Sequence, residues 1–171
     1  ADGKQDDQLA FEVELRDSKG KLVGHEHVSD VDDYAQADMT MTILNPQPWT
    51  PETPYLYTAH IKYMKNGQLV DELTQKFGIR TISMSKEGGF QLNGVTRKIK
   101  GVCLHHDLGP LGAAVNKAAL IRQIKMMKDM GCDAIRTSHN MPSQMQMDIC
   151  DALGMMVMAE SFDMWVYPKC K

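Results

Sequence analysis

The hydrophobic period of this 171-residue chain changes near residue 82, and that change constrains the fold more than any other feature. Before it, apolar and polar residues alternate, as Phe-Glu-Val-Glu-Leu over residues 11–15 illustrates. After it, continuous apolar runs are separated by stretches whose apolar residues recur at helical spacing. Alternation is typical of strands with one buried face, whereas apolar strands separated by helices indicate a parallel sheet. The pattern predicts two domains, over residues 1–82 and 83–171.

The first domain has the pattern of a small antiparallel β-sandwich. Alternation recurs over residues 37–43 and 57–63, and Asn66-Gly67 predicts a hairpin turn because both residues tolerate positive φ. Residues 45–54 contain four prolines, which exclude a central strand and predict a rigid connector. We expect about five strands where an immunoglobulin-like sandwich has about seven. The domain is therefore predicted to lack strands at its N-terminal end.

The second domain follows the order strand, helix, strand, helix, strand. Apolar runs predict the three strands at residues 99–104, 134–137 and 155–159. Asn116 is placed to cap a helix over residues 117–130, and Ser143 with Gln146 forms a capping box for a second helix. This order predicts a parallel sheet with right-handed crossovers.

Polar residues follow each predicted parallel strand at once, over residues 105–107, 138–140 and 160–163. In parallel α/β folds, ligands bind at the carboxyl ends of the strands, so we expect these residues to share one edge and form a binding site. Arg136 lies in an otherwise apolar strand and needs a partner, for which Glu160 on the adjacent strand is the natural candidate.

Other interpretations of this edge stay open. Arg136 and Glu160 could be a purely structural ion pair. His105, His139 and Glu160 carry groups that suit zinc, although they lack a short ligand spacing. Ser138 could be a nucleophile, but no glycine-flanked turn presents it.

Composition excludes several classes of function. A net charge of −3 with both signs interspersed does not indicate a nucleic-acid partner. No run of about 18 apolar residues predicts a membrane span, and the polar first eight residues do not form a secretory signal. We expect a soluble protein of the periplasm or cytoplasm. The four cysteines have neither zinc-site nor disulfide-framework spacing, and we expect buried, reduced thiols.

Ordered motifs, mostly between Phe77 and Trp165, resemble glycoside hydrolase family 2 and in particular its β-galactosidases. They include Trp49-Thr-Pro-Glu-Thr-Pro-Tyr-Leu-Tyr57, Phe77-Gly-Ile-Arg-Thr-Ile82, Lys100-Gly-Val-Cys-Leu-His-His-Asp107, Ala134-Ile-Arg-Thr-Ser-His-Asn140 and Cys150-Asp-Ala-Leu-Gly154. The resemblance implies an immunoglobulin-like β-sandwich over residues 1–82, followed by the first three strands and two helices of a TIM barrel over residues 83–171. Since such a barrel needs about 250 residues, we expect a fragment of a larger enzyme.

The resemblance also implies a retaining β-glycosidase that uses two glutamates. In the family, the acid/base residue belongs to an Asn-Glu pair after the fourth barrel strand, and the nucleophile follows the seventh. This chain has no Asn-Glu pair and ends before either strand. We therefore expect no catalytic residue in it, and no activity of the isolated chain on terminal β-galactosides.

What carries over from the family is the part that holds the sugar. The expected substrate-binding residues are His105, Asp107, His139 and Asn140, and the expected supporting residues are Arg136 and Glu160. The resemblance implies a carbohydrate substrate. We expect no cofactor, and the magnesium ligands of some family members are not identifiable in this chain. A non-catalytic carbohydrate-binding module is the alternative. We also expect exposed apolar surface over residues 155–158 of the truncated barrel, and self-association through its edge.

Overall fold

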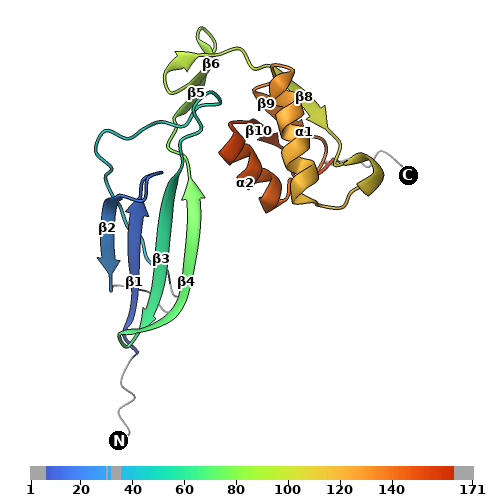
Figure 1. The fold of residues 1–171 in the computed structure, drawn as a ribbon. Helices are drawn as coiled ribbons and strands as arrows, with labels where there is room; N and C mark the ends of the chain where they lie inside the picture. Colours follow the sequence, from blue (N-terminus) through green and yellow to red (C-terminus); the bar gives the residue numbers. More distant parts are fainter. Residues whose placement is uncertain (1–6, 30, 32–35, 164–171) are drawn as a thin grey trace, which may run out of the picture. The chain divides into compact units, whose positions relative to one another are not determined.

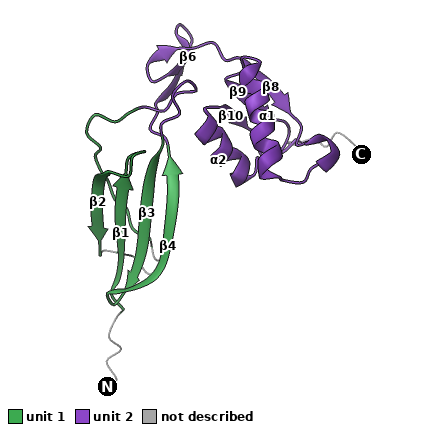
Figure 2. Cartoon of the chain, in the orientation of Figure 1, with its two compact units in different colours: residues 1–47, 56–77 green, residues 48–55, 78–171 purple. Residues whose placement is uncertain are grey.

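The structure, a computed structural model, describes residues 7–29, 31 and 36–163. The chain divides into two compact units, residues 1–47 with 56–77 and residues 48–55 with 78–171 (Figure 2). The chain thus passes between the units three times. The expected boundary between residues 82 and 83 stays a prediction.

The first unit is a four-stranded antiparallel sheet with the strand order β2-β1-β3-β4 (Figure 1). Its strands are β1 (Leu9–Arg16), β2 (Leu22–Val28), β3 (Tyr57–Lys65) and β4 (Gln68–Phe77). The expected alternation is present in β1, where Val13 and Leu15 are buried. Glu12, on the opposite face of β1, carries an oxygen 3.5 Å from the Lys62 ammonium of β3. One face of β1 is therefore apolar and the other polar, which specifies its register in the sheet.

The strand expected over residues 37–43 does not form a hydrogen-bonded ladder. Burial still alternates there, with odd-numbered residues half-buried and even-numbered residues exposed. The segment leads to Asn45, whose φ is +49°, and then to the proline-rich connector. A proline has no N–H to donate to a neighbouring strand. The alternation indicated which side chains face inward, but the strand prediction itself is wrong.

The second unit contains a three-stranded parallel sheet with the order β10-β9-β8, and two helices cover one of its faces (Figure 1). Its elements are β8 (Gly101–Leu104), the 3-10 turn η1 (Gly109–Leu111), α1 (Lys117–Asp129), β9 (Ala134–Thr137), α2 (Gln144–Leu153) and β10 (Met156–Ala159). The predicted order of strands and helices is therefore confirmed. Its buried core includes Leu120 and Ile124 of α1, Ile149 and Cys150 of α2, and Ile135 of β9.

A separate antiparallel sheet precedes these elements in the chain. It contains β5 (Ile82–Ser85), β6 (Gly89–Leu92) and β7 (Val95–Thr96), with β6 in the middle. The turn between β6 and β7 contains Asn93 and Gly94, both at positive φ. Asparagine and glycine tolerate that conformation, which lets the chain reverse direction between β6 and β7.

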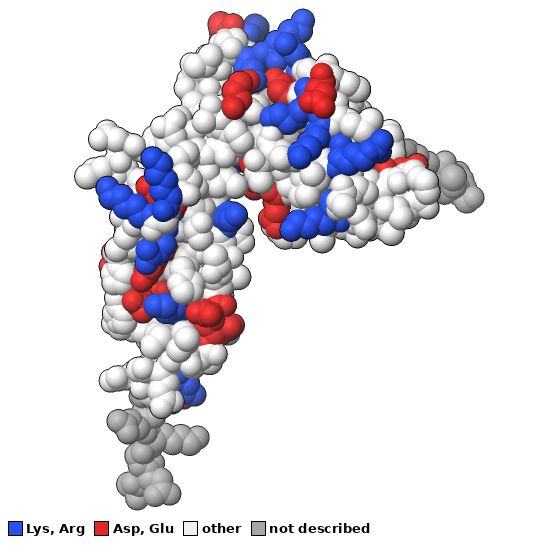
Figure 3. Space-filling view, in the orientation of Figure 1, with Lys and Arg blue, Asp and Glu red and all other residues white. Residues whose placement is uncertain are grey.

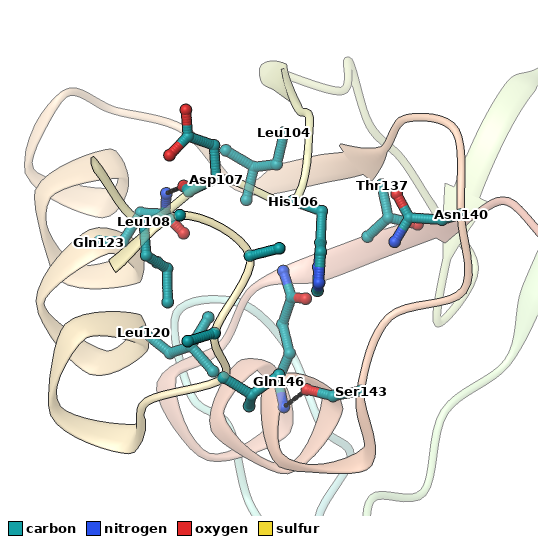
Figure 4. Close-up of a pocket in the computed structure, with 14 residues that line it drawn as sticks. Leu104, His106, Asp107, Leu108, Leu120, Gln123, Thr137, Asn140, Ser143 and Gln146 are labelled. Carbon is teal, nitrogen blue, oxygen red and sulfur yellow. Dashed lines mark hydrogen bonds between the residues drawn. The ribbon is translucent and has the colours of Figure 1, made fainter. Parts of the chain in front are cut away.

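Both helices begin at the residues that the sequence indicates. The Asn116 side chain accepts a hydrogen bond from the Ala119 N–H at 3.0 Å, and the Ser143 hydroxyl accepts one from the Gln146 N–H at 3.2 Å. Helix α2 ends at Gly154, whose φ of +74° suits glycine. The Gln146 side chain does not complete the expected capping box, because its amide turns into a small pocket instead (Figure 4).

The described cysteines are free thiols, as expected, but they are not all buried. Cys150 lies in the core, where burial raises the pKa of its thiol to about 12. Cys132 is half-buried, and Cys103 is exposed. Cys103 departs from the prediction because its side chain lies on the face of β8 that the helices do not cover. Cys170 lies outside the described residues.

The expectation of exposed apolar surface over residues 155–158 is correct for one end of this segment and wrong for the other. Met155 is a core residue with 1% of its surface exposed, whereas Met158 is 59% exposed. Val157 packs against the helix-covered core. Met158 and Phe90 help to line an open, mainly apolar cavity of about 260 Å³ within the second unit. Self-association through this surface stays a prediction.

Residues 48–55, which include most of the proline-rich connector, belong to the second unit. They pack against the rest of it through Trp49, which is 2% exposed. Its indole N–H donates to the Asp151 carbonyl at 2.8 Å, and its own carbonyl accepts from the Asn93 amide at 3.0 Å. The Arg80 guanidinium lies 5.3 Å from the ring centroid, in a cation–π arrangement. A side chain at Gly78 would come within 2.9 Å of the indole, so this position requires glycine.

Two cationic side chains hold the rest of the connector. The Lys128 ammonium donates to the carbonyls of Pro51 at 2.8 Å, Leu153 at 2.5 Å and Gly154 at 3.1 Å. The Arg97 guanidinium forms a bidentate pair with Glu52 and also donates to Asp133 at 3.0 Å.

On the face drawn in Figure 3, lysine and arginine side chains lie beside aspartate and glutamate side chains rather than in separate areas. None of the helices in the described part of the chain is long and apolar enough to span a membrane.

We predict that Lys128→Met lowers the free energy of unfolding by about 2–3 kcal/mol, because three carbonyls lose a charged donor. Lys125→Met on the same helix is the matched control, because Lys125 is exposed. Urea denaturation followed by circular dichroism measures both variants. Equal losses in the two variants would contradict this role of Lys128.

A second prediction concerns the pH dependence of stability. Hydrogen bonds from Arg97 lower the pKa of Glu52 from 4.5 to about 2. A carboxyl whose pKa is lower in the folded state than in the unfolded state stabilises the protein at any pH above the unfolded-state pKa. This contribution is lost as pH falls toward 2. Because the Glu52 side chain is largely exposed, we expect a contribution of only about 1 kcal/mol.

Stability measured by urea denaturation from pH 7 to pH 2 should therefore fall less steeply in Glu52→Gln than in the unmodified protein below about pH 4.5. Glu87→Gln, at an exposed turn, serves as the control. A Glu52→Gln curve parallel to the parent curve would show that the pair with Arg97 contributes nothing.

Candidate functional site

The three parallel strands deliver polar residues to one edge of the sheet. Leu104 of β8, Thr137 of β9 and Ala159 of β10 are neighbours in the ladder, so the strands end side by side. His105 follows β8 and His139 lies two residues beyond β9, and their ring centroids are 5.6 Å apart with the rings nearly perpendicular. The expectation that these residues share one edge is confirmed. We call this edge, with His105, His139, Arg136 and Glu160, the rim.

Glu160 connects the rim. The Arg136 guanidinium donates from Nε to Glu160 Oε1 at 2.6 Å, and Nη2 contacts the same oxygen. The second oxygen of Glu160 lies 2.9 Å from His139 Nδ1. The Glu160 N–H donates to the Thr137 hydroxyl at 3.1 Å, which holds the backbone against β9. The partnership of Arg136 with Glu160 expected from the sequence is therefore present.

The electrostatics of the rim keep Glu160 ionised. Partial burial by itself raises the pKa of Glu160, but the hydrogen bonds from Arg136 and His139 outweigh burial and lower this pKa below its ordinary value. A second carboxylate, Asp163, lies 3.7 Å from His139 Nδ1. Near His139 there are therefore two carboxylates, Glu160 and Asp163, and one permanent cation, Arg136.

Cys103 of β8 lies two residues before His105, and the sequence predicts no role for it at the rim. The Arg136 Nη1 group donates to its sulfur at 3.7 Å. The Ser138 hydroxyl lies near the thiol but outside good hydrogen-bond geometry, and together with Arg136 it lowers the pKa of Cys103. The sequence around Cys103 does not predict the lowered pKa, because Arg136 and Ser138 come from β9 and the loop after it.

Asp107 and Asn140, two of the predicted substrate-binding residues, are engaged within their own loops. Asp107 Oδ1 accepts from the Gly109 N–H at 2.7 Å, and the Asn140 amide donates to the Met141 carbonyl at 3.2 Å. Both residues line a small pocket behind the rim (Figure 4). Of the four predicted substrate-binding residues, His105 and His139 therefore lie ring to ring, whereas the side chains of Asp107 and Asn140 are bonded within their loops.

The pocket in Figure 4 is too small for a sugar ring. Its cavity of about 20 Å³ compares with roughly 300–1,000 Å³ for ordinary ligand pockets, and it has room for about one water molecule. Gln146 of α2 and His106 point into it from opposite sides (Figure 4). His106 lies within residues 105–107, which were expected at the binding edge, whereas Gln146 was expected only to cap α2.

The structure weakens two of the open interpretations of the rim. Within the described ranges, no group of three histidine, cysteine or acidic residues is placed to hold a metal ion, so the zinc set of His105, His139 and Glu160 is not assembled. Ser138 is 2% exposed, which leaves its hydroxyl out of reach of a substrate.

Comparison with known protein families matches both units. The family described as "Glycosyl hydrolases family 2" matches residues 1–80, and "Glycosyl hydrolases family 2, TIM barrel domain" matches residues 83–164. A β-galactosidase of Bacteroides ovatus is 51% identical over 125 residues, and a putative β-glucuronidase of Formosa agariphila is 41% identical over 157 residues. These alignments cover 73% and 92% of this chain, but only 15% of each relative.

Solved structures of glycosidases superpose on this chain. A family 2 member from Bacteroides cellulosilyticus superposes with a TM-score of 0.87 at 37% identity, covering 95% of this chain and 23% of that protein. A β-glycosidase from Bacteroides vulgatus superposes with a TM-score of 0.82 at 34% identity, covering 94% and 20%. The expected fold class, a sandwich domain followed by the start of a TIM barrel, is therefore confirmed.

We predict that iodoacetamide at about pH 7 alkylates Cys103 at least about tenfold faster than Cys150. The thiolate is the reactive form, and the pKa of Cys103 is lowered whereas that of Cys150 is raised. Mass spectrometry of peptides gives the rate at each site. Arg136→Met should slow alkylation of Cys103 and leave Cys150 unchanged; an unaltered Cys103 rate would contradict the influence of Arg136.

Proposed function

This chain belongs to glycosyl hydrolase family 2, and on that basis we propose that it forms part of the sandwich and the start of the catalytic barrel of a retaining β-glycosidase. We propose further that the whole protein hydrolyses terminal β-galactosides. In this proposal the chain supplies residues that bind and orient the sugar, while the two catalytic carboxylates lie outside it. The isolated chain is then inactive.

The observation that carries the proposal is the pairing of His105 and His139 at the carboxyl edge of the sheet, with 5.6 Å between their rings. Imidazole nitrogens donate or accept hydrogen bonds, which suits the hydroxyl groups of a sugar. Glu160, itself held by Arg136, contacts His139. Asp107 and Asn140, whose side chains are bonded within their own loops, remain proposed substrate-binding residues. Orientation by such contacts contributes to catalysis by placing the scissile bond.

Glu160 is an unsuitable proton donor in this site. A retaining glycosidase needs a protonated acid and an ionised nucleophile about 5–5.5 Å apart. Glu160 is tied to Arg136 and His139, and its lowered pKa keeps it ionised. Both of its oxygens are occupied, so it is poorly placed as a nucleophile as well. The proposal therefore gives Glu160 a supporting role.

Two observations favour a β-galactoside over a β-glucuronide. The relative named as a β-galactosidase is more similar to this chain, at 51% identity, than the one named as a putative β-glucuronidase, at 41%. A uronate carboxylate is normally bound by an unpaired cation. Arg136, the permanent cation of the rim, is already paired with Glu160. The rim thus suits a neutral sugar.

The test is hydrolysis of 4-nitrophenyl β-galactoside and β-glucuronide by the whole protein and by the 171-residue chain. We expect the whole protein to prefer the galactoside and the chain to be inactive. Preference for the glucuronide would refute the proposed specificity, and turnover by the chain would refute the location of the carboxylates. Micromolar galactose binding by a whole protein without turnover would support a carbohydrate-binding module instead.

In the whole protein, His105→Ala and His139→Ala should each lower kcat/KM for the galactoside roughly 10- to 100-fold. The reason is that a polar group left without its partner costs about 1–3 kcal/mol. His60→Ala is the matched control, because His60 contacts Glu72 on the exposed strands of the first unit. An unaltered kcat/KM in both rim variants would remove the basis of the proposal.

A further inference from the structure

Three histidines in the described part of the chain contact a glutamate, and they do not use the same ring nitrogen. His25 and His60 contact Glu12 and Glu72 through Nε2, at 3.3 and 3.2 Å, on exposed strands. His139 contacts Glu160 through Nδ1, at 2.9 Å. The ring of His139 is therefore held by its inner nitrogen, which leaves the outer one directed elsewhere.

The glutamate in this contact acts as an acceptor. Glu160 Oε1 takes hydrogen bonds from the permanently charged guanidinium of Arg136, which favours the ionised carboxylate. The lowered pKa of Glu160 agrees with that state. An ionised carboxylate has no proton to donate, so the proton of a hydrogen bond between Glu160 Oε2 and His139 Nδ1 belongs to the imidazole.

The location of this proton decides what the other nitrogen does. In a neutral imidazole, a proton on Nδ1 leaves Nε2 bare, and a bare ring nitrogen accepts hydrogen bonds. Within the described residues, the polar contacts of His139 with Glu160 and Asp163 are made through Nδ1 and not through Nε2. The side chain is 38% exposed beside the ring of His105, which leaves part of the imidazole open to a ligand at the rim.

We propose that Glu160, itself held by Arg136, is a positioning residue that keeps the proton of His139 on Nδ1 and so makes Nε2 a hydrogen-bond acceptor for a hydroxyl group of the ligand. The identification of that ligand as a sugar rests on the proposed function, but the position of the proton does not. A ligand that presents a carboxylate or phosphate oxygen at this point meets a lone pair and is disfavoured. The rim thus favours ligands that donate a hydrogen bond to His139 Nε2.

The test is nitrogen NMR of the 171-residue chain labelled with 15N-histidine, at about pH 9 where an ordinary imidazole is neutral. A protonated and a bare ring nitrogen have well-separated 15N shifts, and loss of one signal set in His139→Gln assigns the residue. We expect His139 to show a protonated Nδ1 and a bare Nε2. A proton on Nε2 in the unmodified chain overturns the inference without any variant.

Glu160→Ala should move His139 toward a mixture of both tautomers, because the nearer acceptor at Nδ1 is gone and the carboxylate of Asp163 lies 3.7 Å away. Glu72→Ala is the matched control: it removes the partner of His60 and should leave the His139 signals unchanged. His139 signals that stay the same in Glu160→Ala would overturn the positioning role of Glu160. Circular dichroism confirms that each variant is folded before its spectrum is interpreted.

Activity of the whole protein separates this inference from the proposed function. If Glu160 acts through His139, Glu160→Ala lowers kcat/KM for the galactoside, and the double variant with His139→Ala is no slower than His139→Ala alone. Additive losses would contradict action through His139. Absence of galactoside hydrolysis in the unmodified protein would refute the proposed function while leaving the NMR result intact.

Discussion

Parallel pairing of β8, β9 and β10 in one register is the constraint on which the site depends. Leu104, Thr137 and Ala159 are ladder neighbours, so residues that directly follow the strands leave the sheet at the same level. Helices α1 and α2 make this possible, because each returns the chain to the opposite end of the sheet while its apolar side covers one face. Residues more than 50 positions apart, such as His105 and Glu160, thereby reach a common edge.

A chain of contacts runs across that edge from one strand to the next. It begins at the Cys103 sulfur on β8, continues through the Arg136 guanidinium on β9 and ends at Glu160, which in turn holds His139. Cys103 and Arg136 alternate in their strands with Val102 and Ile135, which face the helix-covered core, so they lie on the other face of the sheet. A permanent cation in the middle of the chain favours ionisation of the groups on both sides of it.

Local patterns in the sequence predicted most of the second unit, because caps, helical spacing and apolar strands are all encoded by near neighbours. Asn116, Ser143 and Gly154 mark helix ends in sequence and structure alike. The patterns failed where the outcome depends on distant residues. Residues 37–43 alternate without pairing, since alternation does not encode a partner strand. Likewise, nothing near Cys103 in the sequence indicates that Arg136 will lie beside it.

The route of the chain through the connector has a consequence for modularity. Residues 48–55 belong to the second unit although the strands on either side of them, β1 and β2 before and β3 after, belong to the first. A cut between residues 82 and 83 would therefore leave Trp49 without the Asp151 carbonyl and Lys128 without that of Pro51. These two units are interleaved rather than consecutive, so recombination between genes could exchange them cleanly only as a pair.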